Sequence, residues 1–258
     1  MKQFYPTIHT NRPIAGDFYE MVFDWDPAAN IPLAGQFFTV RVSQQSVPLL
    51  RRPFAFSGFD TDKSTVSMIY QRRGTATQLL VGKRSGDQLD VIGPLGNTFI
   101  PPENDEKPII VAGGVGIGPM MFLAQTLIHK GFRPLFVFGA RSKEFVPDIV
   151  SFSALEPQVC TDDGSLGFHG TTVDFLRSLE TAVIKDAVVY GCGPNPMLKA
   201  CHEFAQKHGI ICEVSMEQVM ACGVGACMGC VIKVVREPGY ARVCKEGPIF
   251  DSKDVVWT

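Results

Sequence analysis

The feature that most constrains this 258-residue chain is a group of four cysteines near its end. Cys222, Cys227 and Cys230 are separated by four and by two residues, and Cys244 follows after thirteen more. This C-x4-C-x2-C spacing with a distant fourth cysteine is typical of plant-type [2Fe–2S] sites, in which four thiolates hold the cluster. Because such a cluster exchanges single electrons, the pattern predicts a redox protein whose other segments bind an electron donor and an acceptor.

Glycines lie between or beside the three clustered cysteines, at Gly223, Gly225 and Gly229. Glycine accepts positive φ and lets the backbone approach a ligand closely. We therefore expect a loop that curls around the cluster and aims backbone N–H groups at its sulfurs, where such hydrogen bonds help to tune the potential.

Two other uses of these cysteines remain open from the spacing. A structural zinc site with four cysteines usually shows two C-x2-C pairs, whereas this chain has one. Disulfides belong to oxidising compartments, but residues 1–6 lack the apolar core of a signal peptide. We expect a cytoplasmic protein in which Cys201 and Cys212 are ordinary buried side chains.

Composition excludes several classes of function. The net charge of −2 gives no electrostatic case for binding nucleic acid. No Ser-His-Asp or paired-carboxylate pattern supports hydrolysis, and the histidines show no metal spacing among themselves. Residues 108–128 carry no charge and match a membrane span in length, but their glycines and Pro119 predict a buried strand, a turn and a packed helix instead.

The chain divides into three predicted parts. Residues 1–101 hold short β-branched and aromatic runs punctuated by glycine and proline, which predicts an antiparallel β-barrel or sandwich with one helix. Residues 102–215 begin in a proline-rich linker and then alternate short apolar strands with helices, which predicts a doubly wound parallel sheet. Residues 216–258 form the cysteine module. The expected strands are 37–42, 65–70, 109–112, 135–139, 159–161 and 187–190, and the expected helices are 75–81, 116–130, 171–180 and 194–208.

Two segments of the first part suit a bound phosphate group. Arg52-Pro53-Phe54-Ala55 lies where a barrel strand ends, and Gly74-Thr75 opens the short helix. An arginine fork and the free N–H groups of a helix N-terminus both favour an anion. The alternative is that Arg51 and Arg52 are a solvated pair beside an ordinary helix start.

Two glycine turns of the second part suit a dinucleotide. Gly113, Gly114, Gly116 and Gly118 lie between a strand and a helix, and Cys192-Gly193 follows a later strand. Ligands of open α/β sheets bind at these carboxyl ends. The first turn departs from G-x-G-x-x-G, so a packing turn is its alternative reading. NADH and NADPH are not distinguished, since Arg141 and Lys143 suit a 2′-phosphate and Glu144 suits ribose hydroxyls.

The order of these motifs resembles the ferredoxin–NADP reductase superfamily, whose arginine motif R-x-[YF]-[ST] binds FAD. Here Ala55 replaces the hydroxyl residue of that motif. The cysteine segment, with Val243-Cys-Lys-Glu-Gly-Pro-Ile-Phe-Asp251, resembles that of the electron-transfer subunits of NAD-dependent, heteromeric (class 1B) dihydroorotate dehydrogenases. The resemblance to these subunits covers essentially the whole chain, and the cysteine segment is its most specific part.

This resemblance implies cofactors and residue roles. It implies FAD at Arg52, Pro53, Phe54, Ala55, Ile69, Tyr70, Gln71, Gly74 and Thr75; a [2Fe–2S] cluster on Cys222, Cys227, Cys230 and Cys244; and NAD over Gly113, Gly114, Gly116 and Gly118, with Cys192 and Gly193 near the nicotinamide.

The resemblance also implies a function in pyrimidine (UMP) biosynthesis. A partner catalytic subunit containing FMN oxidises dihydroorotate, and this chain passes the electrons through [2Fe–2S] and FAD to NAD⁺, in a dimer of heterodimers. The sequence shows no evident base for dihydroorotate oxidation, which would belong to the partner. Alternatives are a reductase serving a hydrogenase, sulfide reductase or oxygenase, and a zinc-containing binding module without redox function.

Overall fold

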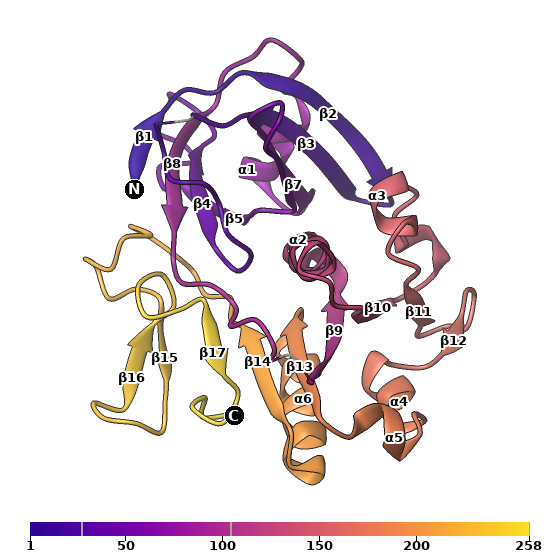
Figure 1. The fold of residues 1–258 in the computed structure, drawn as a ribbon. Helices are drawn as coiled ribbons and strands as arrows, with labels where there is room; N and C mark the ends of the chain where they lie inside the picture. Colours follow the sequence, from indigo (N-terminus) through magenta and orange to yellow (C-terminus); the bar gives the residue numbers. More distant parts are fainter. Residues whose placement is uncertain (27, 104, 258) are drawn as a thin grey trace.

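The computed structural model describes residues 1–26, 28–103 and 105–257. Within these ranges the chain forms two four-stranded antiparallel sheets, a seven-stranded sheet and a two-stranded ribbon. Figure 1 shows the two antiparallel sheets on one side of helix α2 (Ile117–His129) and the seven-stranded sheet on the other. Asn104, in the predicted linker, lies outside the described residues.

The two antiparallel sheets make up the N-terminal part and pack over one aromatic core. Phe38 contacts Trp25, Phe56 and Phe23 with ring centroids 4.8–6.4 Å apart. The sheet orders are β1-β8-β4-β5 and β2-β3-β7-β6. Their strands are β1 (Lys2–Phe4), β2 (Ile8–Ala15), β3 (Phe18–Asp24), β4 (Phe37–Arg41), β5 (Arg52–Ala55), β6 (Gly58–Asp60), β7 (Thr65–Gln71) and β8 (Asp90–Leu95). Helix α1 (Thr75–Val81) has the bounds expected from the sequence.

The seven-stranded sheet has the order β12-β11-β10-β9-β13-β14-β17. Six strands run parallel, as predicted, but β17 pairs antiparallel with β14. This edge strand comes from the cysteine module, so the module is joined to the sheet by backbone hydrogen bonds. The strands are β9 (Lys107–Gly113), β10 (Leu135–Ala140), β11 (Gln158–Thr161), β12 (Phe168–His169), β13 (Ala187–Cys192), β14 (Ile211–Ser215) and β17 (Ile249–Asp251).

Helices cover both faces of this sheet. Helix α2 contacts β9 and β13 on one side and β6 and β7 of the barrel on the other, so it is buried between the two parts. This double burial explains why α2 lacks charged residues. In the described ranges, no helix is long and apolar enough to span a membrane. The other face carries α4 and α6. The remaining helical segments are η1 (Gly114–Gly116), η2 (Lys143–Phe145), α3 (Val150–Ser153), α4 (Thr172–Arg177), α5 (Thr181–Ile184) and α6 (Asn195–His208).

The helix expected over residues 171–180 is shorter than predicted. Thr171 accepts a hydrogen bond from the Asp174 N–H in a capping box, and α4 ends at Arg177. A second short helix, α5, then begins at Thr181. The apolar spacing continues across the break, so the periodicity of the sequence did not reveal where α4 ends.

The segment between β8 and β9 is held to the sheet at Ile100. The Glu213 carboxylate accepts a hydrogen bond from the Ile100 N–H (2.9 Å), and the Tyr190 hydroxyl donates to the Ile100 carbonyl (2.8 Å). Both side chains come from strands of the seven-stranded sheet. This clasp helps fix the orientation of the barrel relative to that sheet.

Candidate functional site

The four clustered cysteines lie together as two pairs. Cys222 lies beside Cys227, and Cys230 lies beside Cys244. The second pair is buried, whereas Cys222 is half-buried and Cys227 exposed. Among the described residues, no three His, Cys, Asp or Glu side chains are placed to hold a single ion. A paired arrangement suits a cluster of two irons held by four thiolates.

Each of the four sulfurs accepts a backbone N–H. Val224 donates to Cys222 (3.5 Å), Gly229 to Cys227 (3.4 Å), Cys244 to Cys230 (3.4 Å) and Gly225 to Cys244 (3.1 Å). Gly223 and Gly225 reach these positions at φ +71° and +84°, in the left-handed region that favours glycine. Hydrogen bonds of this kind stabilise the negative charge of a bound thiolate.

The charge states of these thiols also fit a bound metal cluster. Burial acts to raise the pKa of Cys222, but backbone N–H groups and the Cys227 thiol together lower it to about 6. Burial, with the neighbouring Cys230 thiol, raises the pKa of Cys244 to about 12. A buried thiol such as Cys244 ionises when a metal cation supplies the compensating charge. With a backbone N–H on each sulfur, the four residues fit the group implied by their spacing.

The cysteine loop rests on the barrel. A Cβ added at Gly223 would lie 2.9 Å from Thr39 Cγ2 and 3.9 Å from Leu95 Cδ1. Thr39 lies in β4, directly opposite Pro53 of β5, and neighbouring strands are about 4.8 Å apart. The Thr39 hydroxyl is buried without a hydrogen-bond partner in the described residues. The loop therefore meets the barrel one strand away from the predicted flavin motif.

The predicted FAD segments come together on two strands. Arg52–Ala55 form edge strand β5 and are all half-buried, and the Phe54 ring lies 6.2 Å from the Tyr70 ring of β7. The side chains of Ile69 and Tyr70 are themselves buried in the core. Strand β6 pairs with β7 only over Thr65–Ser67, and beyond this pairing the Ile69 N–H donates to Ser57 Oγ (2.8 Å). The backbone edge left for a bound flavin is therefore the part of β7 that follows the Ile69 N–H.

The third predicted FAD segment lines an open pocket of about 480 Å³. Gly74 and Thr75 share its wall with Arg72, Arg73, Gln78 and Leu79. Arg72 is paired with Asp17 (2.7 Å). The pocket is thus lined by two arginines beside the start of α1, and arginines suit the phosphate part of a dinucleotide.

The two adjacent arginines of the flavin motif have different roles. Arg51 is mostly buried and pairs with Asp90 (2.6 Å), whose carboxylate is 6% exposed. Arg52 donates to the Leu50 carbonyl in its own turn (2.6 Å) and has no buried acid partner among the described residues. Arg51 therefore holds β8, whereas Arg52 is the arginine available to a ligand.

The two glycine turns of the nucleotide part meet at the carboxyl ends of β9 and β13. A Cβ at Gly116 would lie 2.2 Å from the Cys192 carbonyl oxygen, and one at Gly193 would lie 3.0 Å from the Gly113 backbone. A Cβ at Gly118 would lie 2.5 Å from Ser57 Oγ. Gly114, at φ +54°, faces open space. The turn therefore combines both readings made from the sequence: Gly116 and Gly118 are required by packing, and Gly114 leaves room for a ligand.

The remaining nucleotide residues lie around this junction. Cys192 is 3% exposed, and burial raises the pKa of its thiol to about 12, so it stays neutral. Arg141, Lys143 and Glu144 follow β10, whose Gly139 pairs with Gly113. All three are therefore near the edge where a dinucleotide would lie.

Known proteins resemble the chain along its length. The family described as "Iron-sulfur cluster binding domain of dihydroorotate dehydrogenase B" matches residues 217–256. Two relatives are named "Dihydroorotate dehydrogenase B (NAD(+)), electron transfer subunit". The one from Caldanaerobacter subterraneus subsp. tengcongensis is 38% identical, over 96% of each chain. The one from Bacillus pumilus is 36% identical, over 99% of this chain and 98% of its own.

The chain belongs to the family of dihydroorotate dehydrogenase B electron-transfer subunits. A solved NADH-dependent reduced ferredoxin–NADP oxidoreductase superposes with a TM-score of 0.85 at 27% identity, covering 98% of this chain and 90% of its own. These matches confirm the predicted fold class and support FAD, [2Fe–2S] and NAD as cofactors. They support an iron–sulfur cluster, rather than a structural zinc, in the cysteine module.

Sequence reasoning missed a group of residues around the cysteine loop. Arg242 pairs with Glu246 across one turn and donates to the Gly225 carbonyl, and Asn97 binds the Glu246 carbonyl from the β8–β9 connection. The Arg–Glu spacing of four was the only sequence signal for any of them.

Proposed function

We propose that this chain transfers electrons between NAD and a dihydroorotate-oxidising partner subunit that contains FMN, in pyrimidine biosynthesis. Cys222, Cys227, Cys230 and Cys244 hold the cluster; Arg52–Ala55, Ile69–Gln71 and Gly74–Thr75 hold FAD; and the Gly113–Gly118 turn with Cys192–Gly193 holds NAD. When bound, FAD exchanges a hydride with NAD and single electrons with the cluster, so it belongs between them. We further propose the division into parts 1–101, 102–215 and 216–258.

The contact of Gly223 with Thr39 carries this proposal. It brings the cysteine loop against the strand that pairs with the flavin motif, while α2 brings the nucleotide turn against β6 and β7 of the same barrel. The barrel thus contacts the cysteine loop through β4 and the nucleotide part through β6 and β7, and it carries the flavin motif on β5. This is the order that a two-electron donor, a flavin and a one-electron carrier require.

The surface beside the exposed cysteine pair suits a partner protein. Apolar side chains there remain open to solvent, namely Val219 (79%), Val224 (38%), Met228 (41%) and Tyr240 (48%). Exposed apolar groups around a redox site favour docking that excludes water. We propose that the catalytic subunit binds this face in a dimer of heterodimers. A cytoplasmic location is part of the proposal, supported by eight cysteines that are all free thiols.

The purified chain and its co-purified partner test the proposal. The isolated chain should oxidise NADH with an artificial acceptor but show no activity with dihydroorotate, whereas the complex should reduce NAD⁺ with dihydroorotate. Turnover of dihydroorotate by the isolated chain would contradict the assignment. Co-purification with a hydrogenase, sulfide reductase or oxygenase instead would support the alternative class of partner.

A further inference from the structure

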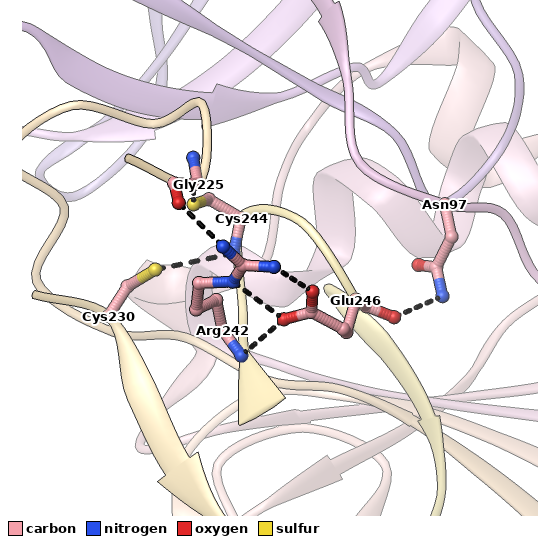
Figure 2. Close-up of polar contacts among 6 residues, drawn as sticks. All are labelled: Asn97, Gly225, Cys230, Arg242, Cys244 and Glu246. Atoms are coloured by element: carbon pink, nitrogen blue, oxygen red, sulfur yellow. Dashed lines mark hydrogen bonds and ion pairs between the residues drawn. The ribbon is translucent and has the colours of Figure 1, made fainter. Parts of the chain in front are cut away.

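The Arg242 side chain joins the cysteine loop to Glu246 (Figure 2). One terminal nitrogen donates to the Gly225 carbonyl (2.7 Å). The Nε donates to Glu246 Oε2 (3.0 Å), and the other terminal nitrogen donates to Oε1. Glu246 Oε2 also accepts the Arg242 backbone N–H (2.7 Å). The guanidinium is thus held on two edges, so its direction toward Gly225 is fixed.

The Gly225 carbonyl belongs to the same peptide unit as the Ala226 N–H, and the two point in opposite directions in a trans peptide. The Ala226 N–H lies near the Cys222 sulfur. The N–H of Gly225 itself donates to Cys244 (3.1 Å). By holding this carbonyl, Arg242 therefore orients the Gly225 N–H, which donates to Cys244, and the Ala226 N–H, which lies near Cys222.

The support continues to the connection between β8 and β9. The Asn97 side chain donates to the carbonyls of Glu246 (3.0 Å) and Ile249 (2.8 Å), and its oxygen accepts the Ile249 N–H (2.9 Å). Figure 2 shows Asn97 and Arg242 on opposite sides of Glu246. The segment that carries Glu246 is thereby fixed to the barrel–sheet connection, far from the cysteine loop in sequence.

We propose that Arg242 is a positioning residue of the iron–sulfur site, which fixes the Gly225–Ala226 peptide and places a permanent positive charge beside the cysteine pairs. This inference rests on the proposed ligand set. The guanidinium stays protonated at all working pH values, and both its charge and the N–H groups it orients favour the more negative, reduced state of a cluster. Arg242 thus raises the reduction potential of the cluster and holds the cysteine loop in its conformation around the four sulfurs.

The competing reading is an ordinary surface ion pair, which would add little stability and leave the site unaffected. The module supplies a matched control for that reading. Arg236 pairs with Asp254 at 3.5 Å and borders the same pocket of about 540 Å³ as Arg242. Within the described part of the chain, no hydrogen bond or ion pair joins Arg236 to the cysteine loop.

The test compares Arg242→Met, Arg242→Lys and Arg236→Met in the purified full-length holoprotein. We measure iron and sulfide content, the cluster midpoint by EPR-monitored titration, and the rate of cluster loss to a chelator; flavin content and circular dichroism report folding. For Arg242→Met we expect the cluster–flavin equilibrium to shift about tenfold toward oxidised cluster, which is ~59 mV for one electron. Cluster loss should be several-fold faster, and Arg236→Met should match the wild type.

Arg242→Lys keeps the charge but not the planar fork, so we expect a midpoint near that of the wild type with cluster loss still accelerated. It also decides the question if Arg242→Met does not fold. Equal midpoints and chelator rates in Arg242→Met and Arg236→Met would overturn the proposal, as would full recovery of both properties by lysine. A wild-type chain without iron and sulfide would instead refute the ligand set.

Discussion

Glu213 gives the chain a pH-dependent stability that one substitution should remove. Its carboxylate is 6% exposed, accepts the Ile100 N–H, and lies opposite Asp251 of β17 and near Tyr190. Burial, opposed by this hydrogen bond and reinforced by Asp251, raises the pKa of Glu213 from 4.5 to about 7. In Glu213→Gln the side-chain oxygen still accepts the Ile100 N–H, but the group no longer ionises.

The sign follows from the raised pKa. Between pH 4.5 and about 7 the unfolded chain loses the proton while the folded chain keeps it, so the wild type loses stability as pH rises through this window. The shift corresponds to at most about 3.4 kcal/mol, at 1.36 kcal/mol per pKa unit. At neutral pH and above, Glu213→Gln should exceed the wild type in stability by up to that amount, and the two should converge near the unfolded-state pKa.

Urea unfolding followed by far-UV circular dichroism, between about pH 5 and about pH 8, measures this difference. The exposed Glu203→Gln change on α6 is the matched control and should give a difference that is flat with pH. A flat difference for Glu213→Gln as well would refute the reasoning, because it would mean that Glu213 ionises in the folded chain as it does in water.

Three further changes test separate parts of the structure. Gly116→Ala places a Cβ 2.2 Å from the Cys192 carbonyl oxygen; it should lower stability by about 1–3 kcal/mol or more in thermal unfolding, and an unchanged melting temperature would contradict the tight turn. Arg51→Met leaves the buried Asp90 carboxylate unpaired and should cost about 3–5 kcal/mol in urea unfolding; a cost under 1 kcal/mol would show that the pair is effectively solvated. Val219→Glu adds charge to an exposed apolar residue and should weaken partner co-purification while NADH–dye activity stays unchanged; equal loss of both would count against the docking face.

Local sequence patterns predicted the elements that depend on local interactions. Helix α1 matches its expected bounds, and β13 extends its prediction by two residues. In both cases the signal is a run of residues whose periodicity or β-branching fits one backbone state. The grouping of Cys222, Cys227 and Cys230 was visible for the same reason, because three of the four thiols lie within nine residues.

Long-range contacts could not be predicted from those patterns. The packing of Gly223 on Thr39 joins segments far apart in the chain, and the antiparallel pairing of β17 with β14 depends on how the cysteine module folds back. Arg51 and Arg52 are adjacent and chemically identical, so only the position of Asp90 separates the structural arginine from the one left for a ligand. Sequence spacing contains no information on such tertiary partners.

The central claim is that electrons from dihydroorotate reach the cysteine-bound cluster of this chain before they reach NAD. Anaerobic rapid-freeze EPR of the purified complex, mixed with dihydroorotate alone, measures this step directly. We predict that the [2Fe–2S] signal grows in the complex within the turnover time and does not grow in the isolated chain. The contradicting result has two parts. The complex would form NADH while its cluster stays oxidised throughout the freeze-quenched series, and it would form NADH equally well when Cys230→Ser has removed the cluster.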